Sequence, residues 1–230
     1  MKQALRSAYV FTLRKLRALF DAVGLLGYFE KRDGRVARWF RSLFAIYDID
    51  DLVHLDLAWW TMDAIDEVDR LLAQRPGARV FEWGSGASTV WLAKRTGQVI
   101  SVEHDAEWAD VVEPKLAQFG HVALRRVPAS NSGQIRSQKY GFEGQFFDDY
   151  VAAIRDEEGV FDLIVIDGRA REACLAEAIP RLASSGIILF DDFKRRRYRD
   201  AVAATDLRVR YLDGLAACLP LPDSTALLSR

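Results

Sequence analysis

Short apolar runs alternate with amphipathic stretches over most of this 230-residue chain. Apolar runs bounded by turn-forming residues predict strands, and apolar residues recurring every third or fourth position predict helices. Because strands alternate with helices, we expect an α/β domain with a seven-stranded, mostly parallel sheet and helices on both faces. The predicted strands are 79–83, 99–103, 122–127, 161–166, 186–190, 208–212 and 225–228, and the helices between them are 87–96, 105–119, 146–157, 171–182 and 194–204.

A helical extension precedes this alternating pattern. Apolar residues recur at helical spacing near the N-terminus, and glycines then break the region into two helices, the second over residues 36–47. A further helix is predicted over residues 52–73. We divide the chain into an extension, residues 1–56, and a domain, residues 57–230. The apolar positions of the first helix are Leu5, Tyr9, Leu13, Leu16, Phe20 and Val23, and the glycines are Gly24, Gly27 and Gly34.

Composition limits the classes of function. Half the residues are hydrophobic, enough for a buried core, and the net charge of −1 gives no overall basic field, so a nucleic-acid partner is not favoured. Cys174 and Cys218 are too few for a disulfide framework and lack metal-ligand spacing, so we expect buried free thiols. We recognise no signal-peptide pattern and no apolar run near the roughly 18 residues of a membrane span. These features predict a cytoplasmic protein.

Charge is nevertheless uneven along the chain. Residues 1–47 contain ten Lys or Arg against three acidic residues, whereas residues 48–80 contain eight acidic residues against three arginines. A basic amphipathic helix can lie on an anionic membrane or bind a partner, or it can pack on the domain with its basic face in water. The sequence leaves these alternatives open. The aromatic extension could also cover a pocket or form a homo-oligomer contact.

The strand-turn-helix-strand unit at residues 79–103 predicts a nucleoside pocket. Gly84-Ser85-Gly86 lets a ligand approach the backbone, and the helix that follows offers unpaired N–H groups. Glu103 lies 19 positions after Gly84, close to the spacing at which a second-strand carboxylate meets a ribose. Thr89 replaces the third glycine of a dinucleotide fingerprint, and Glu82 would repel a pyrophosphate but suits a cation. We therefore favour S-adenosylmethionine over a nicotinamide or flavin nucleotide.

Carboxylates also follow the other long strands. Asp167 comes directly after the strand 161–166, and Asp191 comes directly after the strand 186–190. Ligands of parallel sheets bind beyond the carboxyl ends of the strands, so these two side chains should converge beside the glycine turn. Asp105, by contrast, is better explained as the cap of the next helix.

Four motifs in order, EWGSGAST, SVEHD, FDLIVIDGRAR and GIILFDDF, resemble the class I S-adenosylmethionine-dependent methyltransferases, a Rossmann-like superfamily. The resemblance covers about residues 57–230 and implies the same fold, activity and cofactor. It implies that Glu103 takes the ribose hydroxyls and that His104 lies beside the adenine. Pro128-Ala129-Ser130 stands where many members have an acidic residue for the adenine amino group. The residues that the resemblance assigns to the methionine portion are Glu82, Gly84, Ser85 and Gly86, supported by Ser88 and Thr89.

A weaker similarity links the chain to O-methyltransferases of the catechol type, in which carboxylates after the fourth and fifth strands bind Mg²⁺. Asp167, Asp191 and Asp192 fall at similar positions, and oxygen ligands suit such a cation. However, Asp192 replaces an Asn of that family and Ala170 replaces a lysine. A divalent cation therefore stays a hypothesis.

Our leading hypothesis is O-methylation of a small-molecule or glycan-type acceptor, with Asp167 and then Asp191 as candidate bases. The basic run 194–197, with Arg169 and Arg171 nearby, favours an anionic acceptor. The polar segment 128–144 reads as a loop that could cover the substrate. Two alternatives are a nucleic-acid methyltransferase and a non-catalytic protein that binds a membrane or a partner and retains the cofactor fold.

Overall fold

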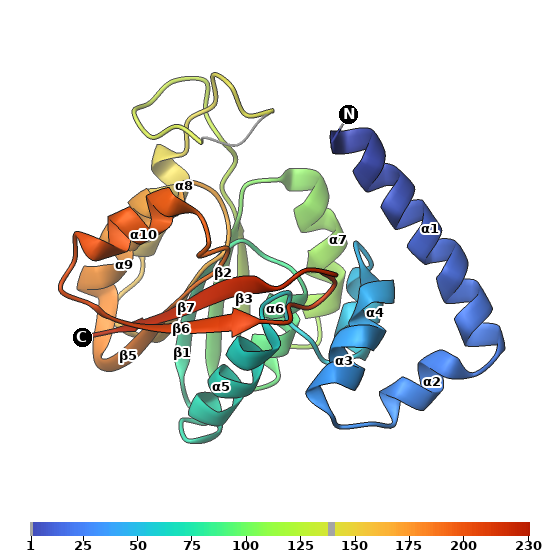
Figure 1. Cartoon of the computed structure of the whole chain (residues 1–230). Helices are drawn as coiled ribbons and strands as arrows, with labels where there is room; N and C mark the ends of the chain where they lie inside the picture. The colour runs from blue at the N-terminus through green and yellow to red at the C-terminus, as the bar shows by residue number, and fades with distance from the viewer. Residues whose placement is uncertain (1, 138–140) are drawn as a thin grey trace.

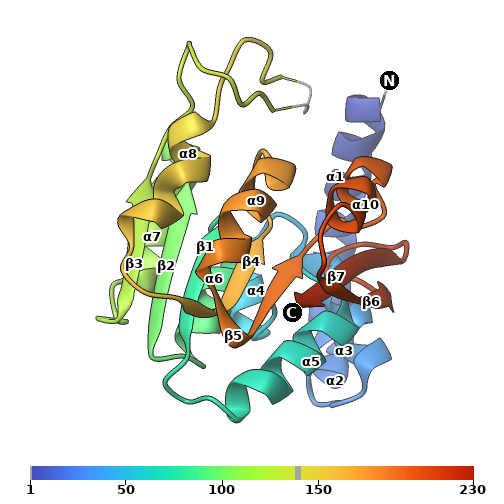
Figure 2. The same ribbon diagram turned by 90° about the vertical axis from the view of Figure 1, so that its left-hand side faces the viewer.

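The computed structural model describes residues 2–137 and 141–230, with side chains from residue 10 onward except that of Arg14. A seven-stranded sheet with the order β3-β2-β1-β4-β5-β7-β6 forms its centre (Figures 1 and 2). Strands β1 to β5 run parallel, and β7 is antiparallel to both of its neighbours. The predicted sheet is therefore confirmed. The strands are β1 (Arg79–Trp83), β2 (Gln98–Glu103), β3 (Val122–Arg126), β4 (Phe161–Ile166), β5 (Leu182–Phe190), β6 (Arg208–Gly214) and β7 (Asp223–Ser229).

Helices cover both faces of this sheet, and alternate strand residues face opposite cores. On β1, Val80 belongs to one buried cluster, whereas Phe81 and Trp83 belong to the other. The first cluster includes residues of α4 (Ile49–His54), α5 (Met62–Ala73), α6 (Ala87–Ala93) and α7 (Ala106–Leu116). The second includes residues of α8 (Asp148–Ala152), the 3-10 turn η2 (Ala153–Asp156), α9 (Arg171–Arg181) and α10 (Arg196–Ala203).

The prediction of one helix over residues 52–73 is wrong. Helix α4 ends at His54, Asp56 adopts a φ of +53°, and α5 begins after Thr61, whose hydroxyl accepts from the Ala64 amide at 3.3 Å. The intervening backbone pairs instead with the connection between β6 and β7: the Met62 amide donates to the Leu215 carbonyl, and the Ala217 amide donates to the Trp60 carbonyl. These long-range contacts override a periodicity that continues across the break. Likewise, β5 begins before residue 186 because Leu182 pairs with Phe161.

Before α4, the described part of the extension forms three helices rather than the two predicted: α1 (Lys2–Ala22), α2 (Leu25–Glu30) and α3 (Arg35–Ser42), followed by the 3-10 turn η1 (Leu43–Ala45). Figures 1 and 2 both place α1 at the outer edge of the molecule. The predicted positions Leu5 and Tyr9 lie outside the residues with described side chains. No helix in the described part of the chain has the length and apolar character needed to cross a bilayer. The domain boundary after residue 56 stays a prediction.

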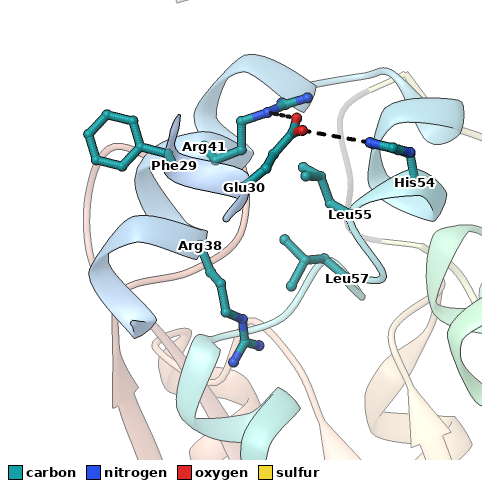
Figure 3. A pocket seen from close by; sticks show the side chains of 7 residues that line it. All are labelled: Phe29, Glu30, Arg38, Arg41, His54, Leu55 and Leu57. Atoms are coloured by element: carbon teal, nitrogen blue, oxygen red, sulfur yellow. Dashed lines mark hydrogen bonds and ion pairs between the residues drawn. The ribbon is translucent and has the colours of Figure 1, made fainter. Parts of the chain in front are cut away.

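Ion pairs between the basic extension and the acidic segment explain much of the uneven charge. Buried Arg41 donates to both carboxylate oxygens of Asp51, at 2.7 and 2.9 Å, and to Glu30 at 2.6 Å. Arg17 pairs with Asp48 at 2.6 Å. A small cavity of about 220 Å³ lies beside Arg41, where Glu30 stands between Arg41 and His54 (Figure 3). These pairs lie within the extension, whereas Arg38 pairs with Asp66 of α5 at 2.7 Å, so the extension is fixed to the domain by charge as well as by apolar packing.

Replacing Arg41 by Met should destabilise the protein by roughly 3 kcal/mol, because Asp51 would stay buried without its bidentate partner. Urea unfolding followed by circular dichroism would measure the loss. Arg199→Met, at an exposed position of α10, serves as the matched control and should change little. Equal stability of the two variants would contradict the importance of this pair.

Candidate functional site

Two loops at the carboxyl edge of the sheet meet backbone to backbone. Gly84, which follows β1, has a φ of +102°, and a Cβ there would lie 2.9 Å from the Cα and the amide nitrogen of Gly168, which follows β4. Neither the conformation nor the space suits a side chain. The contact with Gly168 therefore requires glycine at position 84, independently of any ligand.

Glu82, the penultimate residue of β1, is fully buried beneath this turn. Its carboxylate accepts hydrogen bonds from Ser88 at 2.5 Å, Thr89 at 2.6 Å and Ser101 at 2.7 Å. Burial raises the pKa of Glu82 to about 7, although the three hydroxyls act in the opposite direction. Glu82 thereby ties β1 to α6 and β2. Its observed contacts are all within the protein, and direct contact with a methionine portion stays a prediction.

Glu103, at the end of β2, links the glycine turn to the start of α7. One carboxylate oxygen accepts from the amide and the hydroxyl of Ser85 at 3.0 and 2.9 Å. The other accepts from the amides of His104 and Asp105, and the His104 Nδ1 atom lies 2.8 Å from it. Burial raises the pKa of Glu103, but these hydrogen bonds outweigh burial and lower it. Glu103 is therefore held as an anion.

A cavity of about 380 Å³ opens beside this carboxylate. His104 and the first turn of α7 form one wall, and the loop after β3 forms the other with Pro128, Ala129 and Phe142. Asp105 caps α7 as predicted, because its side chain accepts from the Trp108 amide at 3.1 Å. The remaining lining residues are Ala106, Glu107, Asn131 and Gln145.

Residues 128–137 and 141–144 form a loop without helix or strand, as the sequence predicts. Its base is fixed: the Asp148 carboxylate accepts from the amides of Gln134 and Ile135, and Ser130 pairs with Phe146 through two backbone hydrogen bonds. Residues 138–140 lie outside the described residues. Movement of this loop over a substrate stays a prediction.

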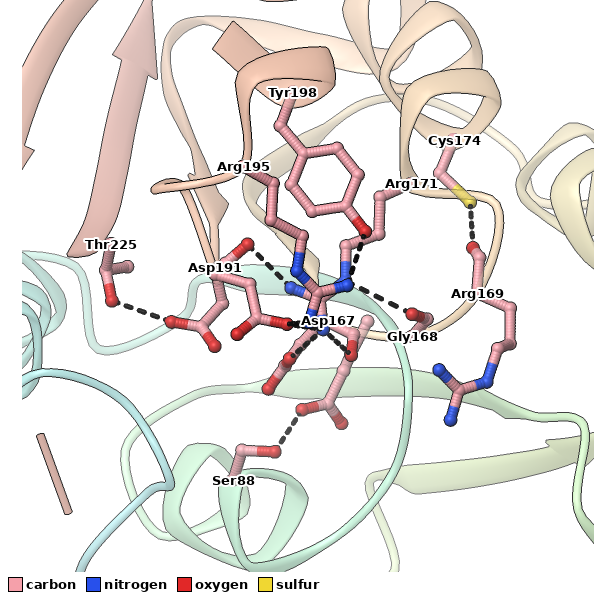
Figure 4. A network of polar contacts seen from close by, with 12 residues as sticks. Ser88, Asp167, Gly168, Arg169, Arg171, Cys174, Asp191, Arg195, Tyr198 and Thr225 are labelled. Atoms are coloured by element: carbon pink, nitrogen blue, oxygen red, sulfur yellow. Dashed lines mark hydrogen bonds and ion pairs between the residues drawn. The ribbon is translucent and has the colours of Figure 1, made fainter. Parts of the chain in front are cut away.

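Arg171, in the first turn of α9, joins the ends of β4 and β5 (Figure 4). Only 6% of it is exposed, and its guanidinium donates to the Asp167 carboxylate at 2.8 Å and to the Asp191 carbonyl at 2.6 Å. It also donates to the carbonyls of Asp167 and Gly168 and lies 3.3 Å from the Asp192 carboxylate. The hypothesis that Arg171 faces an anionic acceptor is wrong, because its donors are used inside the protein.

The two candidate bases lie together at this edge, as the strand order predicts. Burial raises the pKa of Asp167, Arg171 lowers it and the charge of Asp192 raises it, with a net value of about 6. Burial and the charge of Asp167 also raise the pKa of Asp191 well above its usual range, although Thr225 donates to it at 2.7 Å. Asp167 and Asp191 are thus near one another and resist simultaneous ionisation. Their catalytic roles stay a prediction.

Asp167, Asp191 and Asp192 do not fit a divalent cation. The Arg171 guanidinium contacts Asp167 and Asp192 directly and supplies the positive charge that a metal would bring. Among the described residues, no group of three His, Cys, Asp or Glu side chains is arranged to hold a metal. The weaker similarity to magnesium-binding enzymes therefore has no counterpart in this geometry.

The basic run after β5 is largely neutralised within the chain. Arg195 pairs with Asp192 at 2.6 Å, Arg197 pairs with Glu172 at 3.1 Å, and Lys194 donates to the Pro222 carbonyl. Arg169 differs from this run. It points away from Arg171, its Nε donates to His104 Nε2 at 3.3 Å, and its guanidinium lies 5.0 Å from the centre of the Phe142 ring (Figure 4).

Sequence reasoning missed three residues that organise this site. Ser101 and Arg171 satisfy buried carboxylates, and Trp108 donates from its indole to the Ser85 carbonyl at 2.8 Å. The spacing of Asp167 and Arg171, four positions apart across a helix start, was a usable signal for an ion pair. No local pattern indicates the contacts of Ser101 and Trp108.

Comparisons with known proteins agree with this geometry. Residues 81–193 match the family model described as "Methyltransferase domain". A methyltransferase-like protein from Silicibacter pomeroyi DSS-3 shares 21% identity at a TM-score of 0.50, covering 73% of this chain and 86% of that protein. No curated protein matches the chain in sequence.

Two further solved structures share the fold. An rRNA methylase from Streptococcus thermophilus has 13% identity and a TM-score of 0.53, covering 72% of this chain and 95% of that protein. A protein from Streptococcus mutans described as a methyltransferase, in complex with SAH, has 12% identity and a TM-score of 0.51, covering 72% and 97%. The family match identifies a methyltransferase domain over residues 81–193, and the solved structures share its fold; together these findings support a class I S-adenosylmethionine-dependent methyltransferase.

The raised pKa of Glu82 predicts a specific pH dependence of stability. The folded state holds the proton up to a pH of about 7, whereas an unfolded glutamate loses it near 4.5, so ionisation should cost stability as the pH rises between these values. Glu82→Gln should remove up to roughly 3 kcal/mol of this loss. Urea unfolding of both proteins between about pH 5 and pH 8 tests this.

The exposed Glu113→Gln substitution provides the control, because its curve should stay parallel to that of the wild type. If the Glu82→Gln curve also stays parallel, Glu82 has an ordinary pKa and the assignment fails.

Proposed function

We propose that this methyltransferase transfers a methyl group to an oxygen atom of an anionic small-molecule or glycan-type acceptor, with Asp167 as the base. The observation that carries the proposal is Asp167 itself: a partly exposed carboxylate beyond β4 whose pKa is raised to about 6. A base of that pKa is unprotonated near neutral pH and still accepts a proton. Arg171 and the adjacent Gly168 fix its position beside the glycine turn.

The cofactor would lie across the turn 84–86 and the end of β2. Gly84 and Gly86 would leave the backbone accessible, and Glu103 would accept from the ribose hydroxyls, for which Ser85 has to give up part of its hydrogen bonding. The cavity lined by His104 and Phe142 supports an adenine position there, because it offers aromatic and apolar surface beside the acidic residues Asp105 and Glu107. Ser88 and Thr89 would act through Glu82.

Methyl transfer follows from this arrangement. Bound S-adenosylmethionine would supply an activated methyl group, which the acceptor oxygen would attack as the bond to the sulfonium sulfur breaks, with S-adenosylhomocysteine as the other product. The proton of the acceptor hydroxyl passes to Asp167. Because the sulfonium is already an activated donor, alignment of the two reactants supplies most of the catalysis, on the order of 7–11 kcal/mol. Asp191 is the second candidate base.

The charge pattern supports a small anionic acceptor over a nucleic acid. The side chains of residues 194–197 pair with neighbouring acids and carbonyls, so they are less available to bind the phosphates of a nucleic acid. Arg169 has no carboxylate partner among the described residues and stands at the rim near His104, where it could meet one acceptor anion. The rRNA methylase that shares the fold is too distant in sequence to argue for RNA.

Glu103→Gln should weaken the binding of S-adenosylhomocysteine by roughly tenfold or more, the scale of about 1–3 kcal/mol for a lost hydrogen bond to a charged group. Titration calorimetry measures this, with Glu113→Gln on α7 as the control. An unchanged dissociation constant would remove Glu103 from the ribose site.

Asp167→Asn should abolish methyl transfer while leaving the affinity for S-adenosylhomocysteine within a few fold. Labelled S-adenosylmethionine with a panel of hydroxylated carboxylic acids and sugar phosphates would measure turnover, and the exposed Asp110→Asn is the control. In the wild type, turnover should fall as the pH drops below about 6, where Asp167 becomes protonated. Normal turnover by Asp167→Asn would contradict the proposal.

A further inference from the structure

Helix α1 is apolar on two sides. Its inner side packs against the cores of the molecule through Val10, Leu13 and Phe20. On the opposite side, Phe11 is 63% exposed, Leu19 is 56% exposed and Val23, just beyond the helix, is 67% exposed. A helix that packs on a domain needs only one apolar stripe, so the second stripe requires its own explanation.

The second stripe is continuous. Phe11, Lys15, Leu19 and Val23 follow one another at intervals of four residues, which places them on one line along the helix. Tyr28 of α2 adds a further exposed ring, 49% exposed. We call these five residues the outer face. Figure 1 shows α1 along the edge of the molecule, and the exposed fractions of Phe11, Leu19 and Val23 show that the domain does not cover these side chains.

Two groups stand out among the cations of the extension whose side chains are described. Arg17, Arg35, Arg38 and Arg41 pair with acidic residues of the chain itself. Lys15 and Arg32, by contrast, lie over the exposed rings of Phe11 and Tyr28, at 5.5 and 4.3 Å from the ring centres. Among described side chains, neither forms an ion pair with a carboxylate. Internal pairing therefore explains only the first group.

The sequence of α1 is also basic as a whole, although Arg17 is paired with Asp48. Lys2, Arg6, Arg14, Lys15 and Arg17 stand against a single acidic residue, Asp21, over the length of the helix. A basic helix with an exposed apolar stripe combines the two attractions that hold a helix at an anionic bilayer. In a twofold contact between copies, this basic surface would face itself and repel.

We propose that the outer face docks the enzyme on an anionic lipid surface. Phe11, Leu19 and Val23 would enter the boundary between headgroups and acyl chains, and Lys15 would meet lipid phosphates. Arg32 would approach the same headgroups through the ring of Tyr28. The inner side of α1 would stay on the domain, so docking needs no rearrangement of the fold.

Flotation of the full chain with vesicles tests this surface. Binding should be at least about tenfold stronger to phosphatidylcholine vesicles containing one-third phosphatidylglycerol than to pure phosphatidylcholine, and it should weaken with salt. The double variant Phe11→Ser, Leu19→Ser should lose binding, and Lys15→Gln should weaken it. Val160→Ser with Leu221→Ser removes two exposed apolar residues elsewhere and should bind as the wild type does.

Circular dichroism and the affinity for S-adenosylhomocysteine should be unchanged in all these variants, which separates this proposal from the assignment of the cofactor site. Equal binding to neutral and anionic vesicles, or none to either, would overturn it. So would a dimer in solution that the Phe11→Ser, Leu19→Ser variant dissociates without any effect on vesicle binding.

Discussion

Burying a carboxylate at the edge of a parallel sheet costs free energy unless hydrogen-bond donors or a positive charge compensate it. The structure of this site depends on that compensation. Glu82 receives three hydroxyls, Glu103 receives amides and a hydroxyl from Ser85, and Asp167 receives the guanidinium of Arg171. These contacts also connect the ends of β1, β2, β4 and β5. The groups that keep the acids in place are therefore the groups that give the site its shape.

Much of the fold could be predicted because the strand signals are strong. The run 161–166 is apolar except for Asp162, and the run 79–83 is apolar at Val80, Phe81 and Trp83. Both lie at the centre of the sheet and match the observed strands residue for residue. The helix break near Asp56 could not be predicted, because it depends on pairing with residues about 160 positions later in the sequence. The early start of β5 has the same kind of cause, since Leu182 joins the sheet by pairing with Phe161.

The candidate site divides in the same way. Convergence of Glu82, Glu103, Asp167 and Asp191 follows from strand order alone. The sequence could not predict the directions of two arginine side chains. Arg171 lies between the ends of two strands, whereas Arg169, two residues earlier, points toward His104. Because Arg171 contacts the carboxylates of the hypothetical metal site, they form an internal ion pair instead. It also leaves one arginine, rather than a basic cluster, at the rim.

The carboxylates of Glu103 and Asp167 stand beside the turn at Gly84 and favour a positively charged methyl donor over a nucleotide bearing a pyrophosphate. Titration calorimetry of the unmodified protein with S-adenosylmethionine, S-adenosylhomocysteine and NADH tests this preference most directly. The account predicts saturable heat with the first two ligands and none with NADH. Saturation by NADH, with no heat from either sulfur compound, would contradict it.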